Sequence, residues 1–395
     1  MTTVLTPPLS DKPRYNLLDG LRGMGALIVI FFHFGEAFST GWQTQMMNHG
    51  YLAVDFFFIL SGFVIGYAYD SRWRNGNMTP GRFMLRRVIR LHPMVILAMI
   101  LGAAAYIIQG SVRWDGTQMP VESLVIALVC GLILIPAIPH TIMDVRGNAE
   151  MFPLNGPQWS LFFEYIASIF YAIFLHRFST RWLRVFVAVS GIGLAACTFA
   201  NFSGGYTMGY GWSVLGWDII PCGGLVGGLC HVSFCFGTGL LMTRGFKSRN
   251  SIKGSFWICS ALLLAVCVAP YITPDGEISR LNAAYDLLCT FIILPTIVWI
   301  GASGVTTDRF STPRRPPPAI CEGLGNLSYP VYIVHYPIMY LFYSWVWSNN
   351  ITFDSAIPVM GCIFVAIPAI AWIALRYYDE PMRRFLTDRW LRRGK

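Results

Sequence analysis

Long apolar runs, each close to twenty residues, recur along the whole chain and restrict what it can fold into. They lie near residues 17–38, 51–69, 83–109, 121–138, 159–175, 183–200, 222–243, 254–272, 283–301, 325–347 and 355–375. Hydrophobic residues make up 55% of the sequence and charged residues only 12%, about half the charge of a soluble domain. Runs of this length span a bilayer as α-helices, whereas a membrane barrel shows short alternating segments. The sequence therefore predicts an all-α integral membrane protein.

The charges in the loops predict how many of these runs cross the membrane. If segment 121–138 crosses fully, the basic loops that follow it fall outside, against the positive-inside rule. Pro120 precedes the segment, and Pro136 and Pro139 end it, so we expect a re-entrant or half-inserted segment there. This gives a bundle of about ten transmembrane helices with both termini cytosolic. An ordinary short span with a different topology downstream is the alternative.

Three regions follow from this topology. Residues 1–16 lack the basic and apolar pattern of a signal peptide, so we expect a cytosolic N-terminal tail there. Residues 17–378 form the transmembrane domain, and residues 379–395 a basic cytosolic C-terminal tail. The ten cysteines lie within apolar runs or at an edge and make no CxxC pair. We therefore expect neither a disulfide framework nor a metal site.

The first apolar run carries ionisable residues that a spanning helix rarely keeps. Arg22 and His33 are eleven residues apart, close to three helical turns, so they share one face and lie roughly 16 Å apart along the axis. Asp19 lies three residues before Arg22 and has a simpler alternative role, capping the helix or pairing with Arg22. Because charges inside a bilayer are costly, they indicate a substrate pathway, a proton relay or a reaction.

Other runs bring further polar groups to the depth of His33. In the predicted topology Asp55, Glu164 and His335 lie between the middle and the outer surface. Histidine is the natural proton acceptor near neutral pH, and a carboxylate can orient it. His335 also has an alternative role as a packed or hydrogen-bonded residue of the helix bundle.

Two more polar stretches lie at the ends of predicted spans. Trp159 and Ser160 begin one span, where an interfacial anchor and a helix cap are the alternative to a role in the site. A stripe of arginines enters the third span with spacings of three or four residues, at Arg82, Arg86, Arg87 and Arg90. Such a stripe binds phosphates by bidentate hydrogen bonds, and ordinary positive-inside anchoring is the alternative.

These residues carry a resemblance to a known family. The segments concerned are the Arg22–His33 spacing, VDFFFILSGFVIG (54–66), RRVIRLHP (86–93), WSLFFEY (159–165), LGNLSYPVYIVHYP (324–337) and DEP with two arginines (379–384). The chain resembles the membrane-bound acyltransferase family 3, which contains O-acyltransferases of bacterial surface glycans. It departs from the family at Tyr165, where an acidic residue is usual, and at His92, where tyrosine is common.

The resemblance implies transfer of an acyl group, usually acetyl, from cytosolic acyl-CoA to a sugar hydroxyl outside the bacterial cytoplasmic membrane. The acyl-CoA is a donor substrate, no cofactor is bound, and the carbohydrate acceptor is lipid-linked or free. His33 would act as general base or acyl carrier, oriented by Glu164 or Asp55, with Arg22 guiding the donor. The arginine stripe would hold the CoA phosphates. The supporting residues would be Asp19, Trp159, Ser160, Tyr329 and His335.

Two other classes of protein remain as alternatives. A proton-coupled transporter or flippase of a glycan precursor would use the same charges as a pathway, although the sequence shows no internal repeat. A membrane sensor or scaffold would not need a buried face with arginine and histidine. Consumption of acyl-CoA separates the enzyme from both.

Overall fold

The described part of the chain is built from helices. The computed structural model describes residues 15–41, 44–202, 204, 216–217, 223–245, 252–304 and 319–392. The α-helices of this part are α1 (Asn16–Glu36), α2 (Leu52–Arg74), α3 (Pro80–Ile108), α4 (Val121–Leu132), α5 (Gln158–Ile173), α6 (Thr180–Phe199), α7 (Gly223–Gly245), α8 (Ser255–Val268), α9 (Leu281–Leu288), α10 (Leu294–Ala302), α11 (Ala319–Ser348), α12 (Phe353–Ala374) and α13 (Glu380–Thr387). The prediction of an all-α protein is confirmed.

Many of these helices have the length and composition of membrane spans. Within the described residues, seven helical stretches are long and apolar enough to cross a bilayer. They are Asn16–Glu36, Leu52–Arg74, Pro80–Ile108, Thr180–Phe199, Gly224–Gly245, Leu281–Ala302 and Phe353–Leu391. The chain is thus a multi-pass membrane protein. The count of about ten spans and the cytosolic position of both termini stay predictions.

The segment near 121–138 is short, as its prolines suggested. Helix α4 has 12 residues, about 18 Å of helix, so it reaches little more than half the hydrocarbon core. Residues 133–157, which follow it, form turns and bends without a regular helix. Gly131 of α4 lies directly against the side chain of Met99 on α3. This length suits half-insertion, and its depth in a bilayer stays a prediction.

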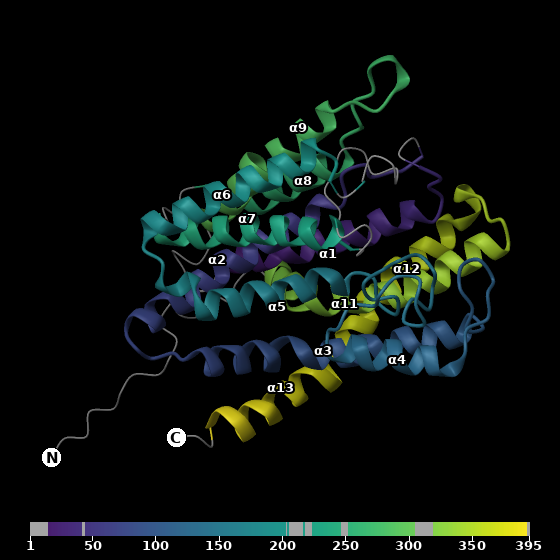
Figure 1. The fold of residues 1–395 in the computed structure, drawn as a ribbon, viewed down its shortest axis with the longest axis horizontal. Coiled ribbons are helices and arrows are strands. Elements are labelled where there is room, and N and C mark those ends of the chain that lie inside the picture. The colour runs from purple at the N-terminus through teal and green to yellow at the C-terminus, as the bar shows by residue number, and fades with distance from the viewer. Residues whose placement is uncertain are drawn as a thin grey trace.

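Glycines allow two pairs of helices to pack closely at the centre of the bundle. A Cβ atom on Gly62 of α2 would overlap the carbonyl oxygen of Phe236 on α7, and one on Gly239 of α7 would overlap that of Ile59. Likewise, Gly23 of α1 faces the backbone of Leu324 on α11. Small residues are the usual means of close helix contact in membranes. Figure 1 shows α1 and α2 in the middle of the molecule, with α6, α7 and α8 on one side and α3, α4 and α5 on the other.

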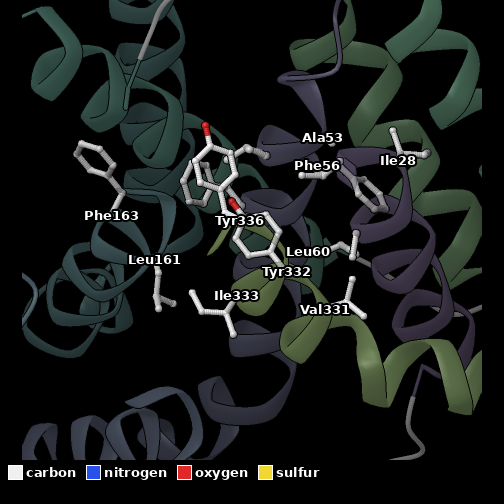
Figure 2. Close-up of a cluster of buried hydrophobic side chains, with 14 of the residues drawn as sticks. Ile28, Ala53, Phe56, Leu60, Leu161, Phe163, Val331, Tyr332, Ile333 and Tyr336 are labelled. Atoms are coloured by element: carbon white, nitrogen blue, oxygen red, sulfur yellow. The ribbon is translucent and has the colours of Figure 1, made fainter. Parts of the chain in front are cut away.

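The buried core lies where α1, α2, α5 and α11 meet. Figure 2 shows Ile28, Phe56, Leu161 and Ile333 around this point. Tyr332 and Tyr336 of α11 belong to the same cluster and bring phenol groups into it. The centre of the bundle therefore combines tight apolar packing with a few polar side chains, which the cavities described below use.

The predicted N-terminal tail lies almost wholly outside the described residues, and most of the predicted C-terminal tail is helical. Residues 1–14 and 393–395 are outside the described residues. The basic cytosolic tail predicted over residues 379–395 stays a prediction; in the structure α12 continues through a π-helical turn, Leu375–Asp379, into α13. Arg383 of α13 pairs with Asp379 at 2.6 Å, so an ion pair joins this helix to the π-helical turn before it.

Candidate active site

Two cavities lie inside the bundle and share part of their walls. One, here the histidine cavity, has a volume of about 280 Å³ and is lined by His33, Glu36, Asp55, Glu150, Trp159 and His231 among others. The other, here the arginine cavity, has a volume of about 200 Å³ and is lined by Arg22, Arg86, Arg87, Arg90, Glu164 and Tyr329 among others. Val54 and Tyr332 line both, so the two cavities adjoin at these side chains.

His33 is paired with a carboxylate of its own helix. Its Nδ1 atom lies 2.6 Å from Oε2 of Glu36, and the two side chains are 12% and 19% exposed. A spacing of three residues places both on one face of α1. The prediction that Glu164 or Asp55 orients His33 is therefore wrong, because Glu36 holds this position. Sequence reasoning missed Glu36, although the three-residue spacing was a signal that could have found it.

Aromatic rings of α11 fix the position of the His33 imidazole. His335 stacks on it with ring centroids 5.2 Å apart, and Tyr336 meets it edge-on at 4.8 Å. The hydroxyl of Tyr343 lies 3.1 Å from Oε2 of Glu36 and 2.9 Å from the carbonyl oxygen of His33, so its one proton is shared between these two acceptors. His335 is fully buried, and its Nδ1 lies 3.3 Å from the carbonyl oxygen of Val331. It thus supports His33 from behind and is not part of the cavity lining.

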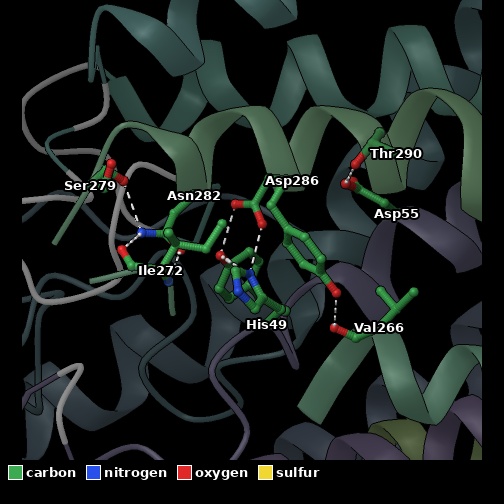
Figure 3. Close-up of polar contacts among 10 residues, drawn as sticks. His49, Asp55, Val266, Ile272, Ser279, Asn282, Asp286 and Thr290 are labelled. Carbon is green, nitrogen blue, oxygen red and sulfur yellow. Dashed lines mark hydrogen bonds and ion pairs between the residues drawn. The ribbon is translucent and has the colours of Figure 1, made fainter. Parts of the chain in front are cut away.

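Asp55 lines the same cavity as His33 but pairs with a different histidine. Its Oδ1 lies 2.6 Å from Nδ1 of His231 on α7, and its Oδ2 accepts a hydrogen bond from Thr290 at 2.9 Å. The bond between Asp55 and Thr290 is visible in Figure 3. The partner His231 was not predicted. It follows Asp55 by 176 residues, so no local sequence pattern predicts the contact between them.

The arginine cavity gathers three members of the predicted stripe together with Arg22. Arg86, Arg87 and Arg90 all line it. Arg87 forms an ion pair with Glu164, whose Oε1 also accepts from Ser61 at 2.8 Å. Glu164 therefore belongs to the arginine cavity, because the guanidinium group of Arg87 binds it there.

The remaining predicted residues divide between the cavities and their surroundings. Nη1 of Arg22 lies 3.3 Å from Oδ1 of Asp19. This is the ion pair that we gave as the alternative role of Asp19. Tyr329 donates to the carbonyl of Leu91 at 2.6 Å and lines the arginine cavity. Arg82 is exposed in the first turn of α3 and is not part of this lining. The structure thus separates Arg82 from the rest of the stripe.

The start of α5 and the middle of α11 close the boundary between the cavities. Trp159 lines the histidine cavity, whereas its neighbour Ser160 lines the arginine cavity. The hydroxyl groups of Ser160 and Tyr332 are hydrogen-bonded at 2.7 Å. Phe57 packs edge-on against the ring of Tyr332, at 5.4 Å between centroids. A hydrogen-bonded pair and an aromatic contact therefore separate the two spaces.

The loop after α4 supplies another wall of the histidine cavity. Its Glu150 accepts a hydrogen bond from Tyr340, and Arg146 lies 3.4 Å from the centre of the Tyr340 ring. Arg146 is only 1% exposed and donates to the carbonyl of Pro153 at 2.6 Å. Burial raises the pKa of Glu150 to about 7, against the opposing effects of Tyr340 and Arg146. Through Glu150 this loop contributes an ionisable side chain to the cavity lining.

This arrangement is suited to group transfer between two bound molecules. A histidine with a carboxylate partner can take a proton from a hydroxyl group, and clustered guanidinium groups bind phosphates. Among the described residues, no group of three or more His, Cys, Asp or Glu side chains is placed to hold a metal ion.

Comparison with known proteins indicates an acyltransferase. The family profile described as acyltransferase domain matches residues 15–376. "Protein 2 in picA locus" of Rhizobium radiobacter is 36% identical over 47% of this chain and 95% of its own length. The "putative membrane-bound transacylase BcsY" of Komagataeibacter xylinus is 28% identical over 51% of this chain and 48% of its own.

A further relative is longer than this chain. The "peptidoglycan O-acetyltransferase OatA" of Listeria monocytogenes is 22% identical over 93% of this chain but over only 55% of its own length. No solved structure gives a significant match. The family profile covers nearly the whole described bundle and both cavities. The chain therefore belongs to the membrane-bound acyltransferase family 3.

Proposed function

We propose that this protein transfers an acyl group, most simply acetyl, from cytosolic acyl-CoA to a hydroxyl of a glycan on the other side of the bacterial cytoplasmic membrane. The observation that carries the proposal is the pair of adjoining cavities. Arginines line one, a histidine–carboxylate pair lines the other, and Val54 and Tyr332 are common to both.

The arginine cavity suits the donor. Four guanidinium groups, those of Arg22, Arg86, Arg87 and Arg90, line it together with the single carboxylate of Glu164, so its charge is positive. CoA carries phosphates, which arginine binds by bidentate, charge-assisted hydrogen bonds. Apolar side chains such as Phe57, Phe58 and Ile65 line the rest of this cavity and suit the pantetheine arm, which then points toward Tyr332.

The histidine cavity suits the acceptor and the proton transfer. Because Glu36 accepts the hydrogen bond from Nδ1 of His33, Nε2 is the nitrogen that takes a proton. Nε2 removes the proton of the acceptor hydroxyl while the hydroxyl oxygen bonds to the acyl carbon of the thioester. The carbon–sulfur bond of the thioester then breaks, and the proton passes from His33 to the CoA thiolate. Glu36 stabilises the imidazolium ion formed between these events.

The first test is acyl-CoA consumption by the reconstituted protein. Purified protein in liposomes receives acetyl-CoA and a soluble glycoside, and the released CoA thiol and the acetylated product are measured. Replacing His33 by Ala is expected to lower product formation by about 10²-fold or more, and Arg22→Ala to weaken the use of acetyl-CoA. Full activity of His33→Ala would contradict the proposed role of His33.

A matched control separates loss of the base from loss of any histidine. His140 is exposed and has a positive φ of 58°, which asparagine tolerates. The His140→Asn variant should keep wild-type activity. Glycoside movement across the membrane without release of CoA would instead favour the transporter alternative. In cells, mass spectrometry of surface glycans with and without the gene identifies the acceptor.

A further inference from the structure

The histidine cavity contains a second histidine–carboxylate pair, which the proposed reaction does not use. His231 of α7 and Asp55 of α2 are joined at 2.6 Å, with side chains that are 13% and 4% exposed. Both line the cavity into which His33 and Glu36 also point. One acyl transfer needs one proton acceptor, because the proton taken from the hydroxyl passes on to the thiolate. The second pair therefore calls for another role.

The second pair is built to hold a fixed position. Each carboxylate oxygen of Asp55 has a hydrogen-bond partner, since Oδ1 binds His231 and Oδ2 accepts from Thr290 at 2.9 Å. Figure 3 shows Thr290 and Asp55 joined between neighbouring helices. A buried carboxylate is tolerated only with such partners. Asp55 thus fixes the orientation of the His231 ring from α2, while Thr290 fixes Asp55.

The walls of the histidine cavity are largely aromatic. Trp159, Trp217, Trp347, Tyr336 and Tyr343 line the histidine cavity. A cavity with apolar, aromatic walls and few polar groups uses those polar groups to orient its ligand. A sugar matches this wall, because its ring presents C–H faces to aromatic side chains and several hydroxyl groups around its edge.

We propose that His231, held by Asp55, binds a second hydroxyl of the acceptor sugar while His33 deprotonates the first. His231 is then an acceptor-positioning residue that determines which hydroxyl meets the thioester. This inference rests on the proposed function and assigns Asp55 to His231, in place of the role beside His33 that its position in the sequence suggested.

The test measures hydroxyl recognition one group at a time. The probes are methyl glycosides of glucose, galactose, mannose and N-acetylglucosamine, with acetyl-CoA as donor. The best of these is then compared with its monodeoxy analogues, in the wild type and in His231→Gln. In the wild type, one deoxy analogue beside the acylated position should show a KM about tenfold higher. This factor corresponds to about 1.4 kcal/mol, one hydrogen bond.

In His231→Gln, the KM of the parent glycoside should be about tenfold higher than in the wild type. The deoxy analogue should then show no further rise in KM over the parent glycoside in this variant. The KM for acetyl-CoA should not change, and the product should contain more than one positional isomer. A general structural defect would affect all glycosides and the donor alike. Thr290→Val, which leaves His231 in place but loosens Asp55, should give a smaller change of the same pattern.

Another histidine–aspartate pair, outside the cavity, provides the matched control. His49 lies 2.8 Å from Asp286, is 1% exposed, and is not part of the cavity lining, so His49→Gln should leave the analogue pattern unchanged. Identical analogue patterns in the wild type, His231→Gln and Thr290→Val would overturn the role of His231 and leave the proposed function standing. Failure of the wild type to acylate any glycoside, with acetyl-CoA present, would overturn both.

Discussion

Oε2 of Glu36 lies 2.6 Å from Nδ1 of His33, one turn away on the same helix. A carboxylate at this nitrogen fixes the tautomer of the imidazole and stabilises its protonated form. Both residues line the histidine cavity, so the proposed base and its carboxylate partner lie on a single helix. His335, Tyr336 and Tyr343 of α11 contact this pair and hold it in position.

Replacing Glu36 by Gln should lower kcat by about 10²-fold, because the amide keeps the shape of the side chain but loses the charge that stabilises the imidazolium ion. The KM for acetyl-CoA should stay unchanged, since Glu36 is not part of the arginine cavity. Steady-state kinetics with both substrates varied measures this. Glu122→Gln, at an exposed position of α4, is the control, and an unchanged kcat in Glu36→Gln would contradict the assignment.

Replacing Arg90 by Gln should raise the KM for acetyl-CoA about tenfold, which corresponds to loss of one charge-assisted contact of about 1.4 kcal/mol. The same variant should use S-acetyl-N-acetylcysteamine as well as the wild type does, because this thioester has no phosphate. Arg82→Gln is the matched control, since Arg82 is exposed and outside the cavity lining. Equal effects on both donors would mean that Arg90 does not bind phosphate.

Replacing Tyr332 by Ala should raise hydrolysis of acetyl-CoA in the absence of acceptor by roughly three- to tenfold. The Tyr332 ring separates the two cavities and hydrogen-bonds Ser160 at 2.7 Å, and removing it admits water to the thioester. Tyr332→Phe keeps the ring and should show a smaller increase. Release of CoA thiol without glycoside measures this, and no increase in Tyr332→Ala would show that another group excludes water.

Glu150 should make the stability of the protein depend on pH. Its pKa is raised from 4.5 to about 7 in the folded state, so between these values the folded state binds the proton more strongly than the unfolded state. The contribution of this group to stability therefore falls as pH rises from about 4.5 to about 7. The Tm of detergent-solubilised protein should fall less over this range in Glu150→Gln than in the wild type. Parallel curves for the two proteins would contradict the raised pKa.

The helices could be predicted because a bilayer leaves few alternatives for an apolar run. The runs near 283–301 and 254–272 correspond to Leu281–Ala302 and Ser255–Val268. Helical spacing likewise placed Arg22 and His33 on one face. The structure adds that they line two different cavities. The positions of the helices and the shared face of Arg22 and His33 could be predicted because each depends only on the sequence within one helix.

The pairing of polar groups was harder to predict, because it depends on how helices pack. Glu164 and His33 have similar predicted depths, yet Arg87 of α3 binds Glu164 in the other cavity. Asp55 meets His231 across the contact between α2 and α7, which the glycines at 62 and 239 allow. Depth in the membrane places a residue along one axis only, and the packing of helices determines the other two.

The common wall of Val54 and Tyr332 has a consequence for the cell. A transporter must expose one site to each side in turn and remake its contacts in every cycle. In the proposed reaction the donor occupies one cavity and the acceptor the other, so only a small acyl group passes this wall. CoA and the glycan then each leave by the side from which they came. On this proposal the bundle exports a chemical group while the bilayer stays sealed, and the ion gradients that energise the membrane are not discharged.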